Sequence, residues 1–255
     1  MTKISNYELW FLQTIFTNKE KYIAYKIIKE NPKESVYNVI KFIKNTEKKL
    51  RSIFKDLEIF IETLKKENKK IISFLELEEL RKKPLSSCHL LALEYKGNIN
   101  ILKQTMISVI GSRKPTYYGR LQTKRIVSEL SQMGFGILSG GAIGIVSVAN
   151  SVAYTMGYPT VSVLGSGLRH LYPKSNANLF EHMMASNHGL ILSEFETKAE
   201  PHKWNFPQRN MTIAALSDFV LVIEATKTSG SLMTAKFALD CHVDVGAVPG
   251  NIRSE

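Results

Sequence analysis

Apolar residues follow two different patterns along this chain, and the change falls near residue 106. From Ile4 to about Leu64 they recur at helical spacing, which predicts three or four amphipathic helices with a break at Asn31-Pro32. Further on, short β-branched runs alternate with helical windows, at 106–110, 135–138, 159–164, 190–193, 219–223 and 243–248. This alternation is typical of a parallel sheet with helices on both faces, because strands that are buried on both sides are apolar almost throughout.

The two patterns predict an α/β protein with an extended Rossmann-like, doubly wound and mostly parallel sheet, preceded by a small all-helical domain. We place the helical N-terminal domain at residues 1–70 and the Rossmann-like domain at 106–255. Residues 71–105 form a transition segment, in which turn residues flank a short apolar run that allows a strand at 90–95. A length of 255 residues exceeds the usual size of one domain, and 44% apolar residues suffice for a packed core.

The composition argues against a membrane, disulfide or metal protein. No apolar run approaches the ~20 residues of a membrane-spanning helix, and residues 1–10 lack the apolar core of a secretion signal. We therefore expect a cytoplasmic protein without membrane contact. Cys88 and Cys241 occur without a CxxC motif or a histidine cluster, so we expect no disulfide framework, no metal site and no cofactor.

Basic residues exceed acidic ones, most of all in the first part of the chain. The formal net charge is +11, with 20 Lys and Arg against 13 Asp and Glu in residues 1–100, and 14 against 10 in the rest. Such an excess favours polyanions, because each phosphate that a protein neutralises releases condensed counterions. Nucleic acid is the natural partner. The alternative is that most lysines are solvated on helix faces in a chain rich in Lys, Ile and Asn.

Small residues and hydroxyl side chains follow the ends of the predicted strands. The strand at 106–110 runs into Gly111, Ser112 and Arg113, where backbone N–H groups, a helix N-terminus and a fixed charge can meet an anion. Four more loops of this kind follow, and the carboxyl ends of parallel strands share one edge. We predict one phosphate-binding groove there. Its candidate residues are Gly111, Ser112, Arg113, Lys114, Ser139, Gly140, Gly165, Gly167, Asn176, Lys203, Phe206, Arg209, Asn210, Ser229, Gly230, Ser231 and Thr234.

Phe206 adds a second kind of contact beside Lys203 and Arg209. Its ring offers a flat face to an unpaired base, a contact worth ~1 to 3 kcal/mol per base in comparable sites. Because only single strands expose base faces, the ring favours single-stranded nucleic acid. Simpler explanations stay open, namely that Phe206 is a core aromatic under a loop, that Ser229 caps a helix, and that residues 111–113 form an ordinary strand-to-helix turn.

These loops, in this order, resemble the DprA/Smf family of DNA-processing proteins. The motifs are GSR at 111–113, SGxAxG at 139–144, YPxxNxxL at 172–179, FPxRN at 206–210, SGSLxTAxxA at 229–238 and PG at 249–250. The resemblance implies an extended Rossmann fold that binds single-stranded DNA without chemistry, forms a homodimer and loads the RecA recombinase in natural transformation. It also implies DNA contacts at Arg113, Lys203, Phe206, Arg209 and Asn210.

The chain departs from the family pattern after the second strand. Where the family usually reads SGxARGID followed by AH, this chain has Ile143 for the Arg, Val146 for the Asp and Asn150 for the His. These changes remove one charge of each sign and lower the polarity expected at this loop. The sequence also stops at Glu255, whereas the family continues through another loop and often a winged-helix domain.

Two other functions are compatible with the sequence. The first is a nucleotide-hydrolysing enzyme of the phosphoribohydrolase type, which shares Gly-rich phosphate loops but carries a PGGxGTxxE signature that is absent here. Glu194 and Glu224 are its only well-placed carboxylates, and a lone Glu at a strand end is more often a helix-cap partner or an ion-pair member than a general base. The second is an adaptor in which the helical domain binds the partner and the Rossmann-like body only holds the shape.

Overall fold

The computed structural model describes residues 4–44, 47–85, 89–226 and 229–250. Its centre is a sheet formed by the β-branched runs of the sequence. The runs from residue 106 onward form parallel strands within one residue of their predicted bounds, namely β3 (Met106–Ile110), β4 (Gly136–Ser139), β5 (Thr160–Leu164), β6 (Gly189–Ser193), β7 (Phe219–Val222) and β8 (Asp244–Ala247). The predicted α/β class with a Rossmann-like, mostly parallel sheet is confirmed.

Two further strands extend the sheet beyond β6. β1 (Ile71–Ser73) and β2 (Ala92–Gly97) pair antiparallel with each other, and β2 pairs antiparallel with β6. The order is β1-β2-β6-β5-β4-β3-β7-β8, so the chain moves outward from β3 to β6 and returns to the other side of β3 for β7. Ligands of open α/β sheets bind beyond the carboxyl ends of the strands at such a reversal, which here lies between β3 and β7.

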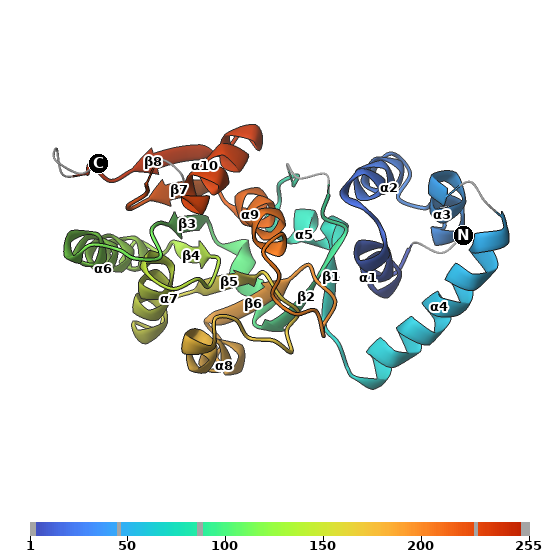
Figure 1. Ribbon diagram of the computed structural model, residues 1–255, viewed down its shortest axis with the longest axis horizontal. Coiled ribbons are helices and arrows are strands. Elements are labelled where there is room, and N and C mark those ends of the chain that lie inside the picture. The colour runs from blue at the N-terminus through green and yellow to red at the C-terminus, as the bar shows by residue number, and fades with distance from the viewer. Residues whose placement is uncertain (1–3, 45–46, 86–88, 227–228, 251–255) are drawn as a thin grey trace.

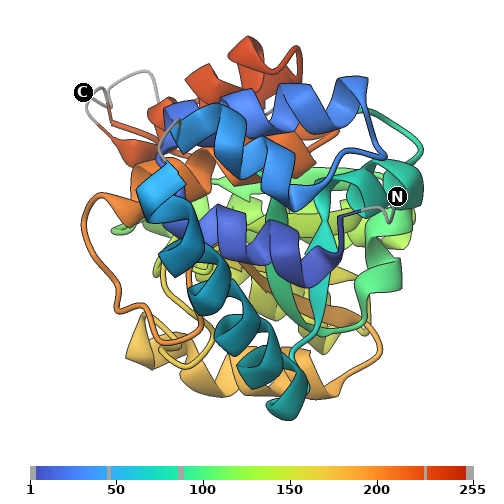
Figure 2. The ribbon, with the colours of Figure 1, turned by 90° about the vertical axis from the view of Figure 1, so that its right-hand side faces the viewer.

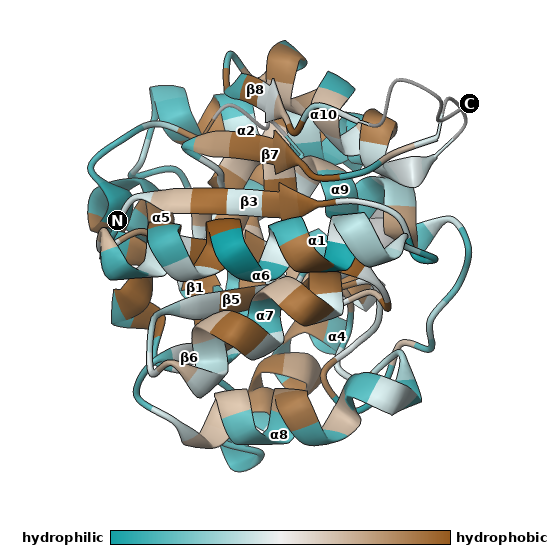
Figure 3. Ribbon diagram, turned by 90° about the vertical axis from the view of Figure 1, so that its left-hand side faces the viewer, coloured by the Kyte–Doolittle hydropathy of each residue, from teal (hydrophilic) through white to brown (hydrophobic). Residues whose placement is uncertain are grey.

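Helices cover both faces of the sheet. α6 (Tyr117–Gln132), α7 (Ile145–Thr155) and α8 (Ala177–Ala185) lie on the face turned toward the viewer in Figure 3, and α9 (Asn205–Leu216) and α10 (Gly230–Asp240) lie on the other. Neighbouring residues of one strand therefore enter different cores. Val109 packs with α6 and α7, whereas Ile110 packs with α10. Coverage on both sides explains why the strands are apolar almost throughout.

The N-terminal helices lie at the end of the molecule opposite α6 (Figures 1 and 2). They are α1 (Asn6–Ile15), α2 (Asn18–Glu30), α3 (Val36–Lys44) and α4 (Glu47–Lys66), and α5 (Phe74–Arg81) follows between β1 and β2. α1 and α2 begin with capping boxes, in which Ser5 and Thr17 accept a backbone N–H and a Glu side chain reaches back. α2 ends at Glu30, directly before the predicted break at Asn31-Pro32.

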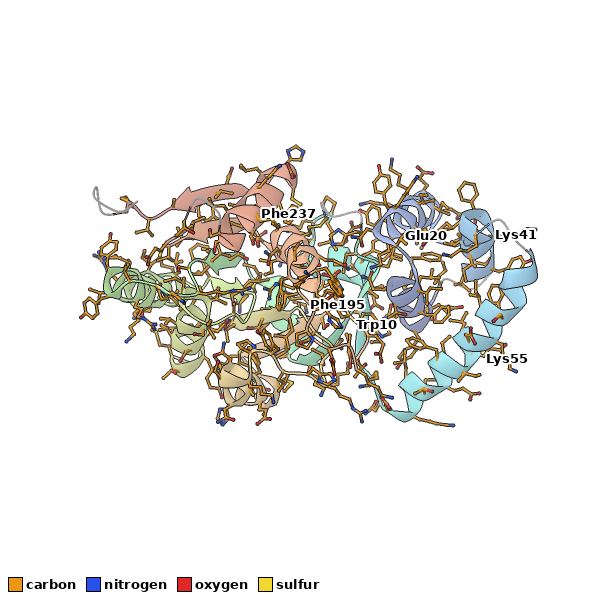
Figure 4. All side chains as sticks on the ribbon, in the orientation of Figure 1. Trp10, Glu20, Lys41, Lys55, Phe195 and Phe237 are labelled. Carbon is orange, nitrogen blue, oxygen red and sulfur yellow. The ribbon has the colours of Figure 1, made fainter. Side chains whose placement is uncertain are left out.

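One apolar core joins the N-terminal helices to the sheet. Trp10 and Leu12 of α1 belong to the same buried cluster as Leu190 and Leu192 of β6. Figure 4 shows Trp10 between α1 and the strands, whereas Lys41 and Lys55 lie on the side away from the sheet. The transition segment forms β1, α5, β2 and a 3-10 turn at Ile99–Lys103, while the domain boundaries at 70 and 105 stay predictions. Within the described residues, no helix has the length and apolarity to cross a membrane.

Candidate nucleic-acid interface

Loops at the carboxyl edge of the sheet surround a pocket of about 760 Å³, which we call the strand-end pocket. The loops after β3, β4 and β7 line it together with the beginning of α9 and of α10. The structure thus brings most of the predicted site residues together in the wall of this one pocket. They are Gly111, Ser112, Arg113, Lys114, Gly140, Lys203, Phe206, Arg209, Asn210, Ser229, Gly230, Ser231 and Thr234.

Ser139 and Asn176, two other predicted contacts, lie beneath this wall and hold it in place. The Ser139 hydroxyl donates to the side-chain oxygen of Asn150, which is fully buried. Asn176 Nδ2 donates to Gly141 O at 2.9 Å, which ties the loop after β5 to the loop after β4. Because these polar atoms are already paired inside the protein, the structure does not place either residue against a ligand.

Gly165 and Gly167 are also predicted contacts that do not reach the pocket wall. The N–H of Gly167 donates to Ala199 O at 2.9 Å, so it is not available to a phosphate. A Cβ at Gly165 would lie 2.8 Å from Cδ1 of Phe206, well inside normal contact distance. Gly165 is therefore a spacer for the Phe206 ring, and the absence of a side chain there serves the protein's own packing rather than the approach of an anion.

Phe206 lies close to two guanidinium groups. Its ring centroid is 5.6 Å from Cζ of Arg113 and 5.8 Å from Cζ of Arg209, within the range of cation–π contacts. The ring of Tyr172 leans against it with 5.9 Å between centroids. Phe206 is half-buried in this position, so it is not the buried core aromatic that the sequence left open. Tyr172, which opens the YPxxNxxL motif, does not line the pocket and supports the Phe206 ring from the side.

Arg209 supports the pocket from inside, and only 5% of its surface is exposed. Its guanidinium donates to Gly140 O, to Val163 O at 2.7 Å and to Asn210 Oδ1 at 3.1 Å. Burial, and next the nearby charge of Arg113, lowers the pKa of Arg209 to about 10, while Glu194 opposes the shift. The group stays charged at neutral pH. Its Nε and Nη1 donate to oxygens of the protein, and the phosphate contact expected from the sequence stays a prediction.

The pocket is electropositive, because cations and helix N-termini face it. Arg113, Lys114 and Lys203 are exposed, and no ion pair among the described residues involves them. α7, α9 and α10 begin around the pocket without a side-chain cap, which leaves the positive ends of three helices uncovered. Ser229 Oγ is shielded from solvent and has no hydrogen-bond partner within the described part of the chain. These features fit the binding of a multiply charged anion.

The departures from the family pattern have different structural effects. Val146 lies in the pocket wall and makes it apolar at this point, and Ile143 is 43% exposed. Asn150 turns inward, donates from Nδ2 to Thr160 Oγ1 at 2.8 Å and accepts from Ser162 Oγ at 3.2 Å. It therefore joins α7 to β5 from below the site. The lower polarity expected after the second strand is thus seen at the wall itself.

The two candidate carboxylates position helices. Glu224 accepts the backbone N–H of Thr116 at 3.0 Å and its hydroxyl at 3.2 Å, which places a negative charge at the N-terminus of α6. Glu194 accepts from Gln208 Nε2 and from Thr212 Oγ1, both at 2.7 Å, and so holds α9. Among the described residues no cluster of three His, Cys, Asp or Glu side chains has the arrangement of a metal site. Cys88 lies outside the described residues.

The fold is Rossmann-like, and its pocket combines cations with a half-buried aromatic ring at the carboxyl edge of the sheet. The chain belongs to the DNA recombination-mediator protein A family, whose model matches residues 77–255, more than half of its length. It is 37% identical over 158 residues to the DNA processing protein DprA of Bacillus subtilis, and 37% identical over 191 residues to that of Streptococcus pneumoniae. The resemblance to the DprA/Smf family is confirmed.

These matches cover parts of the proteins to different extents. The aligned segments make up 62% and 74% of this chain, but 52% and 67% of the Bacillus and Streptococcus proteins. The chain thus spans about half the length of the Bacillus subtilis protein. The X-ray structure of the Streptococcus pneumoniae protein matches with a TM-score of 0.81 at 30% identity, over 99% of this chain and 89% of that chain. DNA processing protein A from Helicobacter pylori, whose structure addresses its single-stranded DNA binding mode, matches with a TM-score of 0.62 at 28% identity, over 72% and 82%.

Proposed function

We propose that this chain binds single-stranded DNA along the strand-end pocket and acts by binding rather than by catalysis. The phosphates lie against Arg113, Lys114, Lys203 and the uncovered helix N-termini, and a base stacks on Phe206. In the role that its family implies, the chain protects incoming strands in the cytoplasm and passes them to a RecA-type recombinase during transformation or recombination. It works as a homodimer.

The observation that carries this proposal is the position of Phe206. A half-buried aromatic ring lies 5.6 Å and 5.8 Å from two guanidinium groups in the wall of the pocket, beside cations that form no ion pair within the described part of the chain. An inorganic phosphate needs the cations but no aromatic ring, whereas a nucleotide unit carries a phosphate and a base and can contact both. A flexible strand offers both partners at once, with charge along its backbone and exposed base faces, whereas a duplex hides the bases.

The enzyme alternative has less support. Glu194 and Glu224 hold helices through the hydrogen bonds described above, and neither lines the strand-end pocket. A nucleotide hydrolase needs a carboxylate at the reacting bond. Incubation of the purified chain with nucleoside monophosphates is expected to release no free base, and measurable turnover at a rate proportional to protein concentration would restore the enzyme hypothesis.

A salt titration of fluorescence anisotropy tests the binding proposal. Labelled single- and double-stranded oligonucleotides are compared for the wild type, Arg113→Ala and the control Arg125→Ala. Both variants lose one positive charge. Arg125 is exposed on α6 and lies outside the pocket wall, so its loss reports the effect of net charge alone. We expect tighter binding of single strands, and a salt slope that falls by about 0.7 in Arg113→Ala but not in Arg125→Ala. Equal binding of duplex, or identical slopes for both variants, contradicts the proposal.

A further inference from the structure

Trp204 is an exposed aromatic residue that the motifs did not single out, and it follows Lys203 of the strand-end pocket in the sequence. It is the residue that precedes α9, and 63% of its surface is exposed. Its indole lies on the imidazole of His202, with 4.9 Å between ring centroids and 14° between planes. Both rings are solvent-exposed, so the pair forms a flat aromatic surface that is already assembled without a ligand.

This surface is rigidly joined to the pocket. The N–H of Asn205 donates to His202 O at 3.0 Å and closes a turn over residues 202–205. Asn205 Nδ2 donates to Gly165 O at 3.0 Å and to Glu200 O at 3.3 Å, which fastens the turn to the loop after β5. Lys203, between the two rings in sequence, lines the pocket.

We propose that Trp204 and His202 form a second base-stacking platform for the strand whose neighbouring base stacks on Phe206, with Lys203 contacting the phosphate between them. This inference rests on the proposed binding of single-stranded DNA and extends that site by one position. Lys203, which lies between His202 and Trp204 in sequence, and Phe206 both line the pocket, so the platform is joined through these residues to the proposed path of the strand. Because every base has a stacking face, the platform accepts any of the four bases but no base pair in a duplex. Its ordered geometry reduces the entropy lost on binding.

The chain contains a built-in spectroscopic test, because its two tryptophans differ in burial. Trp10 is fully buried and Trp204 is exposed. We expect oligo(dT) to quench the tryptophan fluorescence of the wild type, since a base stacked on indole quenches it, and to leave Trp204→Phe, which reports only Trp10, unquenched. Trp204→Ala should weaken oligo(dT) binding at least about fivefold, as expected for the loss of one stacked base. Trp204→Phe, which keeps a ring, should bind more tightly than Trp204→Ala.

A matched control is Phe42→Ala, which removes an aromatic side chain of 71% exposure from α3, outside the pocket wall. It should bind oligo(dT) like the wild type. If the wild type binds but Trp204→Ala binds equally well, or the quenching persists in Trp204→Phe, the platform is wrong while single-strand binding stands. If the wild type does not bind oligo(dT), both inferences are wrong. Circular dichroism of the variants shows that a loss of affinity is not a loss of fold.

Discussion

Gly165→Ala is a one-carbon change that tests how the protein positions Phe206. The new Cβ would lie 2.8 Å from Cδ1 and 2.9 Å from Cε1 of the ring. Ordinary carbon–carbon contacts are ~3.5 to 4.0 Å, so the ring must move by roughly 1 Å. Gly165 does not have a left-handed backbone conformation, so alanine adds no backbone strain. The ring is half-buried and lines the pocket, so we expect it to move toward the pocket and away from its present contacts with the two arginines.

The cost divides between stability and binding. Overpacking destabilises proteins by about 1 to 3 kcal/mol, and we expect the lower end because the ring has space on its pocket side. A stacked base loses contact when its platform moves, which corresponds to roughly a fivefold weaker affinity for oligo(dT). Thermal unfolding measures the first effect and fluorescence anisotropy the second.

A double-mutant cycle with Phe206→Leu identifies the cause. Leucine has no ring to displace, so Gly165→Ala should cost little further stability or affinity in the Phe206→Leu background. If Gly165 instead contacts a phosphate through its backbone, as the sequence alone suggests, its replacement should have the same effect in both backgrounds. Additive effects, within about 0.5 kcal/mol, refute the spacer role of Gly165.

Two further predictions concern polar groups of the scaffold outside the pocket wall. Burial alone would raise the pKa of Asp218, but hydrogen bonds from Lys83 and Met106 N–H, with the charge of Arg81, hold it below its ordinary value. Asp218→Asn should therefore lower the free energy of unfolding, measured in urea above pH ~4, by about 1 to 3 kcal/mol. This difference from the wild type should disappear as the pH falls through the folded-state pKa of Asp218. A difference that stays constant with pH contradicts the prediction. Asn150→Ala should lower the free energy of unfolding by about 2 to 4 kcal/mol, because it leaves the buried hydroxyls of Thr160 and Ser162 without this partner. An unchanged melting temperature would show that Asn150 does not stabilise the contact between α7 and β5.

The sheet was predictable because its strands are short, β-branched and bounded by turn residues. β1 was missed, since the three residues Ile71–Ser73 show no alternation and become a strand only by pairing with β2. The helical spacing up to Leu64 predicted helices but not their packing partner, because a periodic apolar face does not say which surface covers it. In the structure α1 shares a core with β6.

The site was predictable as a set of loops but not residue by residue. The sequence places Arg113 and Arg209 in two motifs for which the same role is expected. In the structure Arg113 is exposed, whereas Arg209 donates hydrogen bonds to buried carbonyls. That difference depends on the distance between loops far apart in the chain, which no local pattern encodes. It also affects the choice of variants, since Arg113→Ala removes a surface charge whereas Arg209→Ala removes internal hydrogen bonds.

The shared core limits which experiments can separate a DNA-binding protein from an adaptor that acts through its N-terminal helices. Deletion of residues 1–98 removes β1 and β2 from the sheet and uncovers Leu190 and Leu192. We therefore expect such a fragment to lose its fold, so that its behaviour reports stability rather than partner binding. Single surface changes, such as Arg113→Ala in the pocket and Phe42→Ala on the N-terminal helices, keep the core intact and compare the two surfaces directly.

The central claim, that a single strand lies in the strand-end pocket, is tested most directly by photocrosslinking. An oligonucleotide with 5-iododeoxyuridine is bound to the full chain, irradiated and digested, and the crosslinked residue is located by tandem mass spectrometry. We predict crosslinks at Phe206, at Tyr172, whose ring contacts it, and at Trp204. These crosslinks should be lost when Arg113→Ala is irradiated at the same concentration. Crosslinks confined to the lysine-rich helices of residues 4–66, with none at the carboxyl edge of the sheet, would contradict the claim.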